Sequence, residues 1–204
     1  MTQQLRYQIQ FYGYWHVGSG LSASTYADSV VLKDPEGFPI IPGKTLKGLL
    51  SEAAKVIGTF QPELVSTDFV RYVFGESGKG EEGTDNQQAV TYMPSACHFS
   101  NATLSGHLRE RLMNATLPDE QKPVNLVNSL YEVLSSTQIE KGLAKKGSLR
   151  QLEVCVPLPL YAVIEGENIN AYAAEIDYCF GWIKRMGLNR NRGLGRCRFT
   201  RMTE

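Results

Sequence analysis

The sequence predicts an α+β domain of the ferredoxin-like (RRM-like) class, in which strands and helices follow the order βαββαβ. Residues 5–17 alternate apolar and polar side chains and are rich in Tyr, Phe and Trp, which is typical of a strand. Residues 45–56 and 171–186 carry apolar side chains at the spacing of a helix. Residues 194–202 alternate again and complete the pattern as a final strand.

Shorter elements are expected between these segments. Thr45 is expected to cap the first helix and Gly58 to end it, while Gly187 is expected to end the second helix. A turn is predicted at residues 34–37, where Asp, Pro and Gly follow one another. Further extended or apolar segments are predicted at residues 30–32, 38–41, 69–74, 89–93, 96–104 and 148–164, the last of them interrupted at Pro157 and Pro159.

Two stretches do not fit the βαββαβ pattern. Residues 105–146 are mostly polar and contain a predicted helix at 124–134, so we expect them to form an insertion. Residues 75–88 are rich in glycine and charge, which predicts a mobile loop. With these two additions, residues 1–204 form one domain, since no second-domain boundary and no internal repeat is present.

The charge is balanced overall but unevenly distributed. The chain has 21 basic and 21 acidic residues, which argues against a non-specific nucleic-acid binder that acts alone. Residues 184–201 nevertheless hold a third of the basic side chains and no acid: Lys184, Arg185, Arg190, Arg192, Arg196, Arg198 and Arg201. This distribution favours a subunit that binds an anion locally and packs against other proteins elsewhere.

Several classes of protein are disfavoured by the sequence. The four cysteines contain no CxxC pair, which argues against a metal site or a disulfide framework. Buried thiols in a reducing cytoplasm are the expectation. No apolar run approaches the roughly 20 residues of a membrane helix, so no membrane partner is expected.

A first candidate anion site lies at residues 41–48. A Pro-Gly turn leads directly into a helix, where free N–H groups and the helix dipole favour a phosphate. Lys44, Thr45 and Lys47 stand in the first turn and can add side-chain contacts. Alternatively, Gly43 only shapes the turn and both lysines are solvated. The P-loop pattern GxxxxGK[ST] is absent.

Two further basic stretches are candidates for phosphate contact. In residues 187–196, glycines alternate with Arg190, Arg192 and Arg196, which suits close approach of a backbone and forked contacts to phosphate oxygens. The alternative is a flexible loop with solvated arginines. In residues 145–150, Lys146 and Arg150 lead into a strand and can follow a nucleic-acid backbone, or they belong to a solvated turn.

Candidate catalytic residues are few. Asp28 lies in a loop of small residues and can help to activate an RNA 2′-hydroxyl or hold a divalent cation, although most loop aspartates only cap or solvate. His16, near the end of the first strand, is either a general base or a packed side chain. Tyr12, Tyr14 and Trp15 either stack on bases or belong to the core.

Four ordered stretches together resemble the RAMP (repeat-associated mysterious protein) superfamily, and within it the backbone subunit of type III CRISPR effector complexes (Csm/Cmr-like). They are WHVGSG at 15–20, ADSVVLKDP at 27–35 with PIIPGKTLKG at 39–48, KGSLR at 146–150 with Glu153, and NRGLGR at 191–196. The resemblance spans nearly the whole chain. The chain is short for this family and lacks its basic excess.

The resemblance implies an RRM-like core with a thumb within residues 105–146. It implies copies that stack along a guide (CRISPR) RNA in a cytoplasmic antiviral ribonucleoprotein, together with other effector subunits and a complementary target RNA. Asp28 falls at the position of the aspartate that cleaves target RNA with a divalent metal (Mg or Mn). Guide phosphates would be held by Lys44, Thr45, Lys47, Lys146, Arg150, Arg190, Arg192 and Arg196.

Three functions are consistent with these features of the sequence. The first is a guide-binding subunit that cuts target RNA through Asp28. The second is an RNA-binding scaffold without cleavage. The third is a metal-independent guide-processing ribonuclease with His16 as general base, since relatives of that kind also end in a glycine-rich loop.

Overall fold

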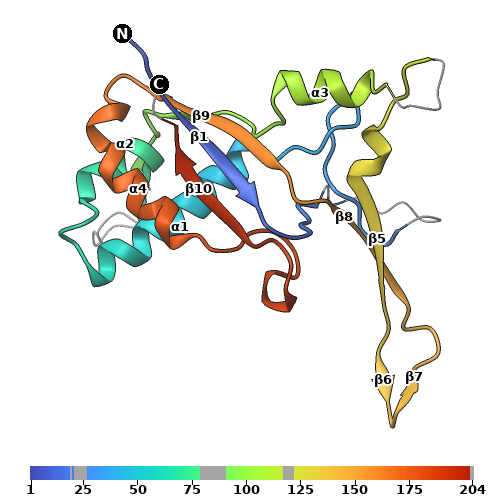
Figure 1. The fold of residues 1–204 in the computed structure, drawn as a ribbon. Helices are drawn as coiled ribbons and strands as arrows, with labels where there is room; N and C mark the ends of the chain where they lie inside the picture. Colours follow the sequence, from blue (N-terminus) through green and yellow to red (C-terminus); the bar gives the residue numbers. More distant parts are fainter. Residues whose placement is uncertain (19, 21–26, 79–90, 117–121, 203–204) are drawn as a thin grey trace.

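A four-stranded antiparallel sheet lies at the centre of the computed structural model, which describes residues 1–18, 20, 27–78, 91–116 and 122–202 (Figure 1). The strand order is β10-β1-β9-β4, so the first and third strands of the core lie in the middle. The core elements are β1 (Gln3–Phe11), α1 (Gly43–Phe60), β4 (His98–Phe99), β9 (Pro159–Gly166), α4 (Ala173–Trp182) and β10 (Cys197–Arg201). This is the ferredoxin-like βαββαβ arrangement and confirms the predicted fold class.

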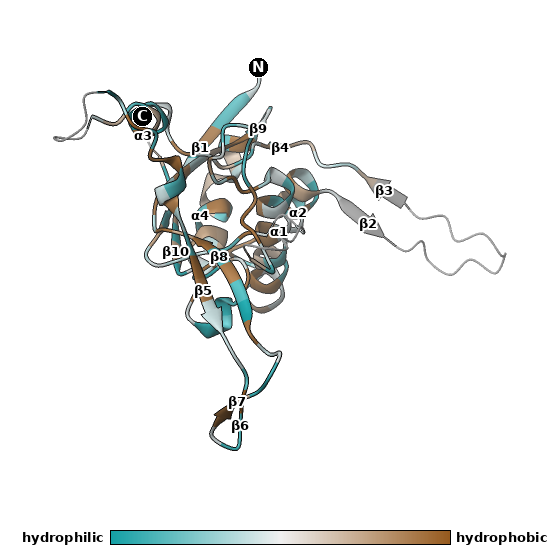
Figure 2. Cartoon of the chain, turned by 90° about the vertical axis from the view of Figure 1, so that its right-hand side faces the viewer, coloured by the Kyte–Doolittle hydropathy of each residue, from teal (hydrophilic) through white to brown (hydrophobic). Residues whose placement is uncertain are grey.

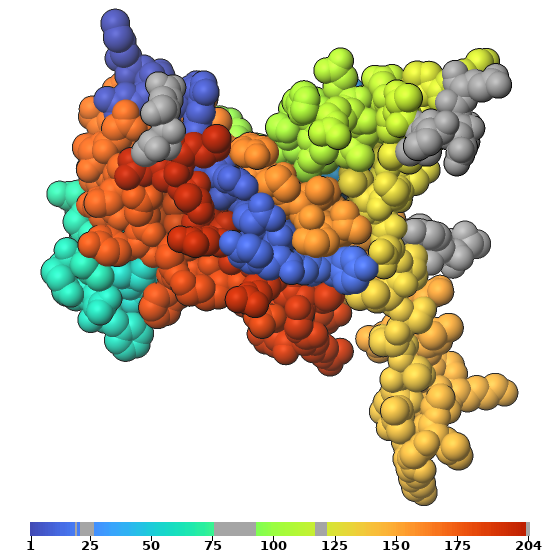
Figure 3. All heavy atoms as spheres, viewed as in Figure 1, coloured from blue at the N-terminus to red at the C-terminus, as the bar shows by residue number. Residues whose placement is uncertain are grey.

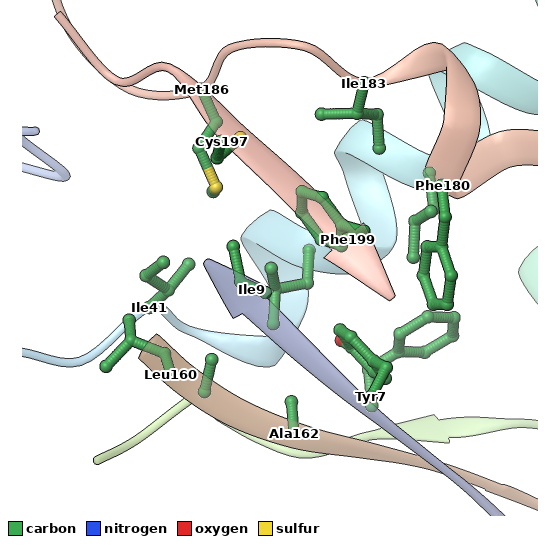
Figure 4. Packing of buried hydrophobic residues seen from close by; sticks show 14 of the residues in the cluster. Tyr7, Ile9, Ile41, Leu160, Ala162, Phe180, Ile183, Met186, Cys197 and Phe199 are labelled. Carbon is green, nitrogen blue, oxygen red and sulfur yellow. The ribbon is translucent and has the colours of Figure 1, made fainter. Parts of the chain in front are cut away.

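One face of the sheet carries the core. In β1, Leu5, Tyr7, Ile9 and Phe11 are buried, whereas the glutamines between them lie on the other face. Figure 4 shows the core side chains from β1, β9, β10 and α4 pointing toward one another. Helices α1 and α4 therefore cover one face and leave the other open, as the view of Figure 1 shows.

β1 is shorter than predicted, because the extended segment at 5–17 leaves the sheet after Phe11. Trp15 then pairs with Cys155, and Gly18 pairs with Val31, through isolated bridges. The residues after Phe11 are therefore also extended, but they pair with Cys155 and Val31 and not with the strands of the central sheet. The chain thus crosses from the sheet to a separate part of the protein.

α1 begins earlier and ends later than predicted. Pro42 is its N-cap, so the expectation that Thr45 caps the helix is wrong. The start is fixed by packing, because a Cβ at Gly43 would lie 2.0 Å from the carbonyl oxygen of Phe99. Apolar side chains at helical spacing, from Leu46 to Ile57, face the sheet and carry the helix past Gly58.

α4 is shorter than predicted. A 3₁₀ turn (Ile169–Tyr172) precedes it, and the helix ends at Trp182, before the expected stop at Gly187. Met186 N–H donates to Gly195 O and Cys197 N–H to Lys184 O, both at 3.0 Å, so residues 184–186 are extended beside the start of β10. Ile183 and Met186 are both buried, and their spacing imitates a helix.

A second helix, α2 (Thr67–Phe74), follows α1 and contains the predicted apolar segment at 69–74. Ser66 caps it by accepting a hydrogen bond from Phe69 N–H at 3.2 Å. Strands β2 (Glu76–Gly78) and β3 (Thr91–Met93) pair next, so the strand predicted at 89–93 is present in its described part. The predicted mobile loop at 75–88 lies largely outside the described residues.

The strand predicted at 96–104 is divided. Only His98–Phe99 forms β4, and Ala102 and Thr103 then make isolated bridges to Ile41 and Tyr161. The extended region at 148–164 is divided as well, into β8 (Arg150–Cys155) and β9, which begins at Pro159. Proline lacks the N–H that continues a ladder, which explains the break at the predicted place.

The segment between β4 and β9 forms an arm that projects from the sheet (Figures 1 and 3). It contains α3 (Gly106–Met113), a 3₁₀ turn (Val127–Leu130), β5 (Tyr131–Ser136), β6 (Ile139–Glu140), β7 (Leu143–Ala144) and β8. The helix predicted at 124–134 is wrong, because residues 131–136 pair with β8 instead. Ile139 and Leu143 are exposed on the two short strands of the β6–β7 hairpin, and Figure 2 shows brown there beside a hydrophilic turn.

Contacts with the 33–38 segment anchor the arm. Tyr131 donates to Gly37 O at 2.6 Å, and Lys33 Nζ lies 3.9 Å from the centre of the Tyr131 ring. On α3, Arg109 binds the carboxylates of Asp34 and Glu36. These contacts fix the base of the arm and leave the hairpin free.

The cysteines agree with the expectation of buried thiols. All four cysteines are buried free thiols, and burial raises the pKa of Cys97 to about 11 and the pKa of Cys179 to about 12. None of the helices in the described part of the chain is long and apolar enough to cross a membrane.

Two glycine substitutions on α1 should have opposite effects. Gly43→Ala places a Cβ against Phe99 O and should lower the free energy of unfolding by roughly 1–3 kcal/mol. Gly48→Ala, with no atom within 4 Å of the new Cβ, should raise it by up to about 1 kcal/mol. Urea unfolding monitored by circular dichroism measures both. Equal effects of the two variants would contradict the packing described for Gly43.

Candidate RNA interface

Three segments that are far apart in the sequence meet at one groove, called here the α1 groove. Its lining includes residues 16–18 after β1, Lys44, Thr45 and the acid Glu52 on α1, and Gly187 and Arg190 after α4, and its volume is about 390 Å³. Each segment belongs to a different stretch singled out in the sequence. The fold therefore brings the first helix start and the glycine-rich loop together.

The helix start offers fewer free amides than expected. Gly43 N–H donates to Asn101 Oδ1 at 3.0 Å, and the N–H groups of Thr45 and Leu46 donate to Pro42 O. The expectation of a phosphate held by several free N–H groups is therefore wrong for these three amides. The exposed side chains of Lys44 and Thr45 are what this turn presents to the groove.

The glycine-rich loop is docked on the segment after β1. Leu188 N–H donates to His16 O and Gly195 N–H to Tyr14 O, each at 2.8 Å. A Cβ at Gly187 would lie 2.2 Å from His16 O, and Gly187 has φ +90°. Glycine is needed here for contact with the protein's own backbone rather than with a ligand.

The remaining basic candidates do not share the α1 groove. Lys47 is half-buried outside its lining, and Arg192 is exposed in the 3₁₀ turn Arg190–Arg192. Arg196 lies over the ring of Tyr12, 5.8 Å from its centre. Lys146 and Arg150 lie on the arm, which Figure 1 shows projecting from the sheet. The candidates thus form a central pair, Lys44 and Arg190, and several outlying positions.

The three aromatic candidates have different environments. Trp15 is buried, stacks on Phe11 at 4.5 Å between ring centres and donates to Val156 O. Tyr14 donates to the carboxylate of Glu132, and this hydrogen bond raises the pKa of the phenol. Tyr12 is 56% exposed, so its ring is the most open to solvent of the three.

Asp28 is exposed and lies beside β8. Its N–H donates to Gln151 O at 2.8 Å, and its Oδ2 accepts from Gln151 N–H at 2.7 Å. This pairing holds the carboxylate next to Arg150, the first residue of β8. Most of the preceding loop, residues 21–26, lies outside the described residues.

His16 is a packed side chain in this structure. It is 1% exposed, and its Nδ1 lies 2.7 Å from Glu153 O. Because a carbonyl only accepts, Nδ1 is the donor, and Nε2 then faces the hydroxyl of Ser29 at 3.1 Å. A general base must reach the proton that it removes, and this geometry leaves His16 no open nitrogen.

A buried carboxylate organises the segment that follows Asp28. Glu153 is 2% exposed, and its two oxygens accept from Val31 N–H at 2.9 Å and from Lys33 Nζ at 2.8 Å. Its own N–H donates to Ser29 O. Local patterns do not predict this pair, since Lys33 and Glu153 are 120 residues apart. Glu153 thus fixes residues 29–33 on β8.

The donor set near Asp28 suits one kind of metal site. Within the described residues, no three side chains of the His, Cys, Asp and Glu types gather to hold an ion. Asp28 has one carboxylate oxygen beyond the bond to Gln151. Mg²⁺ is commonly held by one or two carboxylates, waters and substrate phosphates, so Asp28 fits an ion that arrives with RNA.

Removing the buried carboxylate should be costly. Glu153→Ala leaves Lys33 and Val31 N–H without their acceptor and should lower the free energy of unfolding by roughly 3 kcal/mol. Glu140→Ala is the matched control, since its ion pair with Lys145 is exposed and should change stability by about 0.5 kcal/mol at most. Equal losses in urea unfolding would show that Glu153 does not organise this segment.

Comparisons with known proteins agree with this architecture. No curated protein shows a match to the sequence. The fold is similar to a chain of a cryo-EM structure of the Type III-B Cmr-beta bound to cognate target RNA, with a TM-score of 0.66, 14% identity and coverage of 98% of this chain and 97% of that chain. A cryo-EM structure of Type III-B Cmr-beta in the apo state gives a TM-score of 0.65 and 16% identity, with 98% of each chain covered.

The family match extends over most of the sequence. It covers residues 9–198, and so includes the segment after β1, the start of α1, the arm and the glycine-rich loop. The resemblance stated from four separate stretches is thereby confirmed for the chain as a unit. The chain belongs to the RAMP superfamily.

Proposed function

We propose that the chain is the guide-RNA-binding backbone subunit of a type III CRISPR effector complex. The observation that carries this proposal is the α1 groove, where Lys44 and Arg190 face the same surface hollow. Two cations on one groove suit a phosphodiester backbone. The similarity in fold to Cmr-beta chains over nearly the full length supports the same assignment.

The arm supports an assembly role. It ends in a hairpin whose exposed Ile139 and Leu143 find no partner within the described part of the chain. Exposed apolar side chains on a projecting hairpin suit contact with another molecule. We propose that copies of the chain stack along the guide, each placing its hairpin against RNA or a neighbouring subunit.

We further propose that the subunit cuts complementary target RNA at Asp28 with a divalent metal, Mg²⁺ or Mn²⁺. Asp28 would contribute its open carboxylate oxygen to the ion, while Gln151 keeps the carboxylate in place through its N–H. Bound there, the ion would neutralise charge on the scissile phosphate. The buried free thiols suit the reducing cytoplasm in which we expect the complex.

Guide binding is tested by removing the two cations of the α1 groove. Lys44→Gln with Arg190→Gln should weaken binding of a labelled single-stranded RNA roughly tenfold at about 0.15 M salt, because two phosphate contacts are lost. Fluorescence anisotropy measures the affinity. Lys55→Gln with Arg111→Gln removes the same charge from exposed positions outside the grooves and should change it less than about twofold. Equal effects would refute the α1 groove as the guide site.

Cleavage is tested in the assembled complex. Asp28→Ala and Asp28→Asn should both reduce metal-dependent cutting of target RNA by on the order of 10²-fold or more and leave guide binding intact. The Asn variant keeps an acceptor for Gln151 N–H, so it separates the loss of charge from a displaced segment.

The other outcomes identify the competing functions. A wild-type complex that makes no products with Mg²⁺ or Mn²⁺ is a scaffold. Cutting of repeat RNA in EDTA that is abolished by His16→Ala would favour guide processing, which the burial of His16 argues against.

A further inference from the structure

A second groove, called here the edge groove, runs along the open side of β10. It has a volume of about 850 Å³ and lies between the end of α4 and the outer edge of the sheet. Figures 1 and 3 show β10, in red, at the surface between α4, in orange, and β1, in blue. Among the residues assigned above to RNA, only Arg196 lines it.

Like charges are placed opposite one another in this groove. Arg185 and Arg196 form an antiparallel bridge, so their side chains stand directly across from each other, and Arg198 follows two residues later on the same side. Opposed like charges destabilise a sheet unless a counter-charge lies between them. Within the described residues, neither Arg185 nor Arg198 has an acidic partner, whereas Arg201 is paired with Asp177. The arrangement is suited to an anion.

The strand edge adds backbone donors. Tyr12 N–H donates to Arg196 O and Met202 N–H to Arg6 O, so the even-numbered residues of β10 face β1. The N–H groups of Phe199 and Arg201 therefore point away from β1 toward the open edge. Of the N–H groups on this edge in the described part of the chain, only that of Cys197 already donates a hydrogen bond, to Lys184 O. Both remaining N–H groups can donate to phosphate oxygens.

An aromatic ring completes the groove and favours a nucleic acid over an acidic peptide. Tyr12 is 56% exposed, and the guanidinium of Arg196 lies 5.8 Å from its ring centre. An open ring beside an arginine is a platform on which a base can stack while the cation contacts the backbone. A peptide strand would use the backbone donors and leave this ring without a role.

The edge groove connects with the α1 groove. Ile183, Lys184 and Arg185 line both the edge groove and a smaller groove of about 250 Å³ beside Trp182. That smaller groove shares Arg190 with the α1 groove. The three grooves are therefore joined through shared lining residues, with the acid Glu52 and apolar side chains between the basic ones, and a single strand can pass from one site to the other.

We propose that the edge groove binds a second stretch of single-stranded RNA, with Arg185 and Arg198 on its phosphates and one base stacked on Tyr12. This inference rests on the proposed function, since it extends the path of RNA beyond the α1 groove. It assigns RNA contacts to Arg185 and Arg198, which belong to the basic stretch at 184–201 but to none of the three candidate phosphate sites, and it favours stacking over core packing for Tyr12.

The test uses the full chain and a labelled, unstructured single-stranded RNA of about 30 nucleotides. Arg185→Gln with Arg198→Gln should weaken binding roughly tenfold and should reduce the slope of log affinity against log salt by about 1.4, the value for two single-strand phosphate contacts. Ultraviolet crosslinking to the Tyr12 peptide should persist in Tyr12→Phe and be lost in Tyr12→Ala. Lys55→Gln with Arg111→Gln is again the control of equal charge.

The results separate this inference from the proposed function. An effect of Lys44→Gln with Arg190→Gln, but none beyond the control for Arg185→Gln with Arg198→Gln, overturns the edge groove alone. The reverse pattern supports the edge groove and overturns the α1 groove as guide site. Wild-type protein that binds no RNA overturns both. Unchanged RNA affinity with weaker association of copies in mass photometry would show that the edge takes a protein strand, which also overturns the proposal.

Discussion

Residues 14–18 hold the two halves of the protein together, because their backbone is hydrogen-bonded on several sides. Trp15 exchanges both backbone hydrogen bonds with Cys155 of β8, while the carbonyls of Tyr14 and His16 accept from the glycine-rich loop. The ring of His16 donates to Glu153 O. Buried backbone groups must be paired, so this short segment fixes both the arm and the loop relative to the sheet.

This central role explains why several sequence motifs lie together. Gly187 and Gly195 are required where the loop backbone touches the protein's own chain, and both have φ values that favour glycine. The glycines of the motif that suggested phosphate binding therefore serve the packing of the loop against the protein's own backbone. The arginines between these glycines remain exposed and are available for a ligand.

The core could be predicted from the sequence because local periodicity and tertiary packing agree there. The alternation of β1 and the apolar face of α1 match their buried faces. Prediction failed where the pattern was ambiguous: Ile183 and Met186 imitate a helix, and residues 131–134 form a strand because β8 is available as a partner. The spacing of residues within one segment does not predict which distant segment it will pair with. For the same reason, the contact of Glu153 with Lys33 and the edge groove became visible only in three dimensions.

Residues 14–18 also determine how far the proposed guide site lies from the proposed cleavage residue. Lys44 and Arg190 belong to the sheet side, whereas Asp28 is hydrogen-bonded to β8 in the arm. The distance between the proposed guide-binding pair and the proposed cleavage residue therefore depends on how residues 14–18 join the two sides. If RNA binds in the α1 groove as proposed, this fixed separation would decide which phosphate reaches Asp28, and copies stacked along the strand would repeat the same interval.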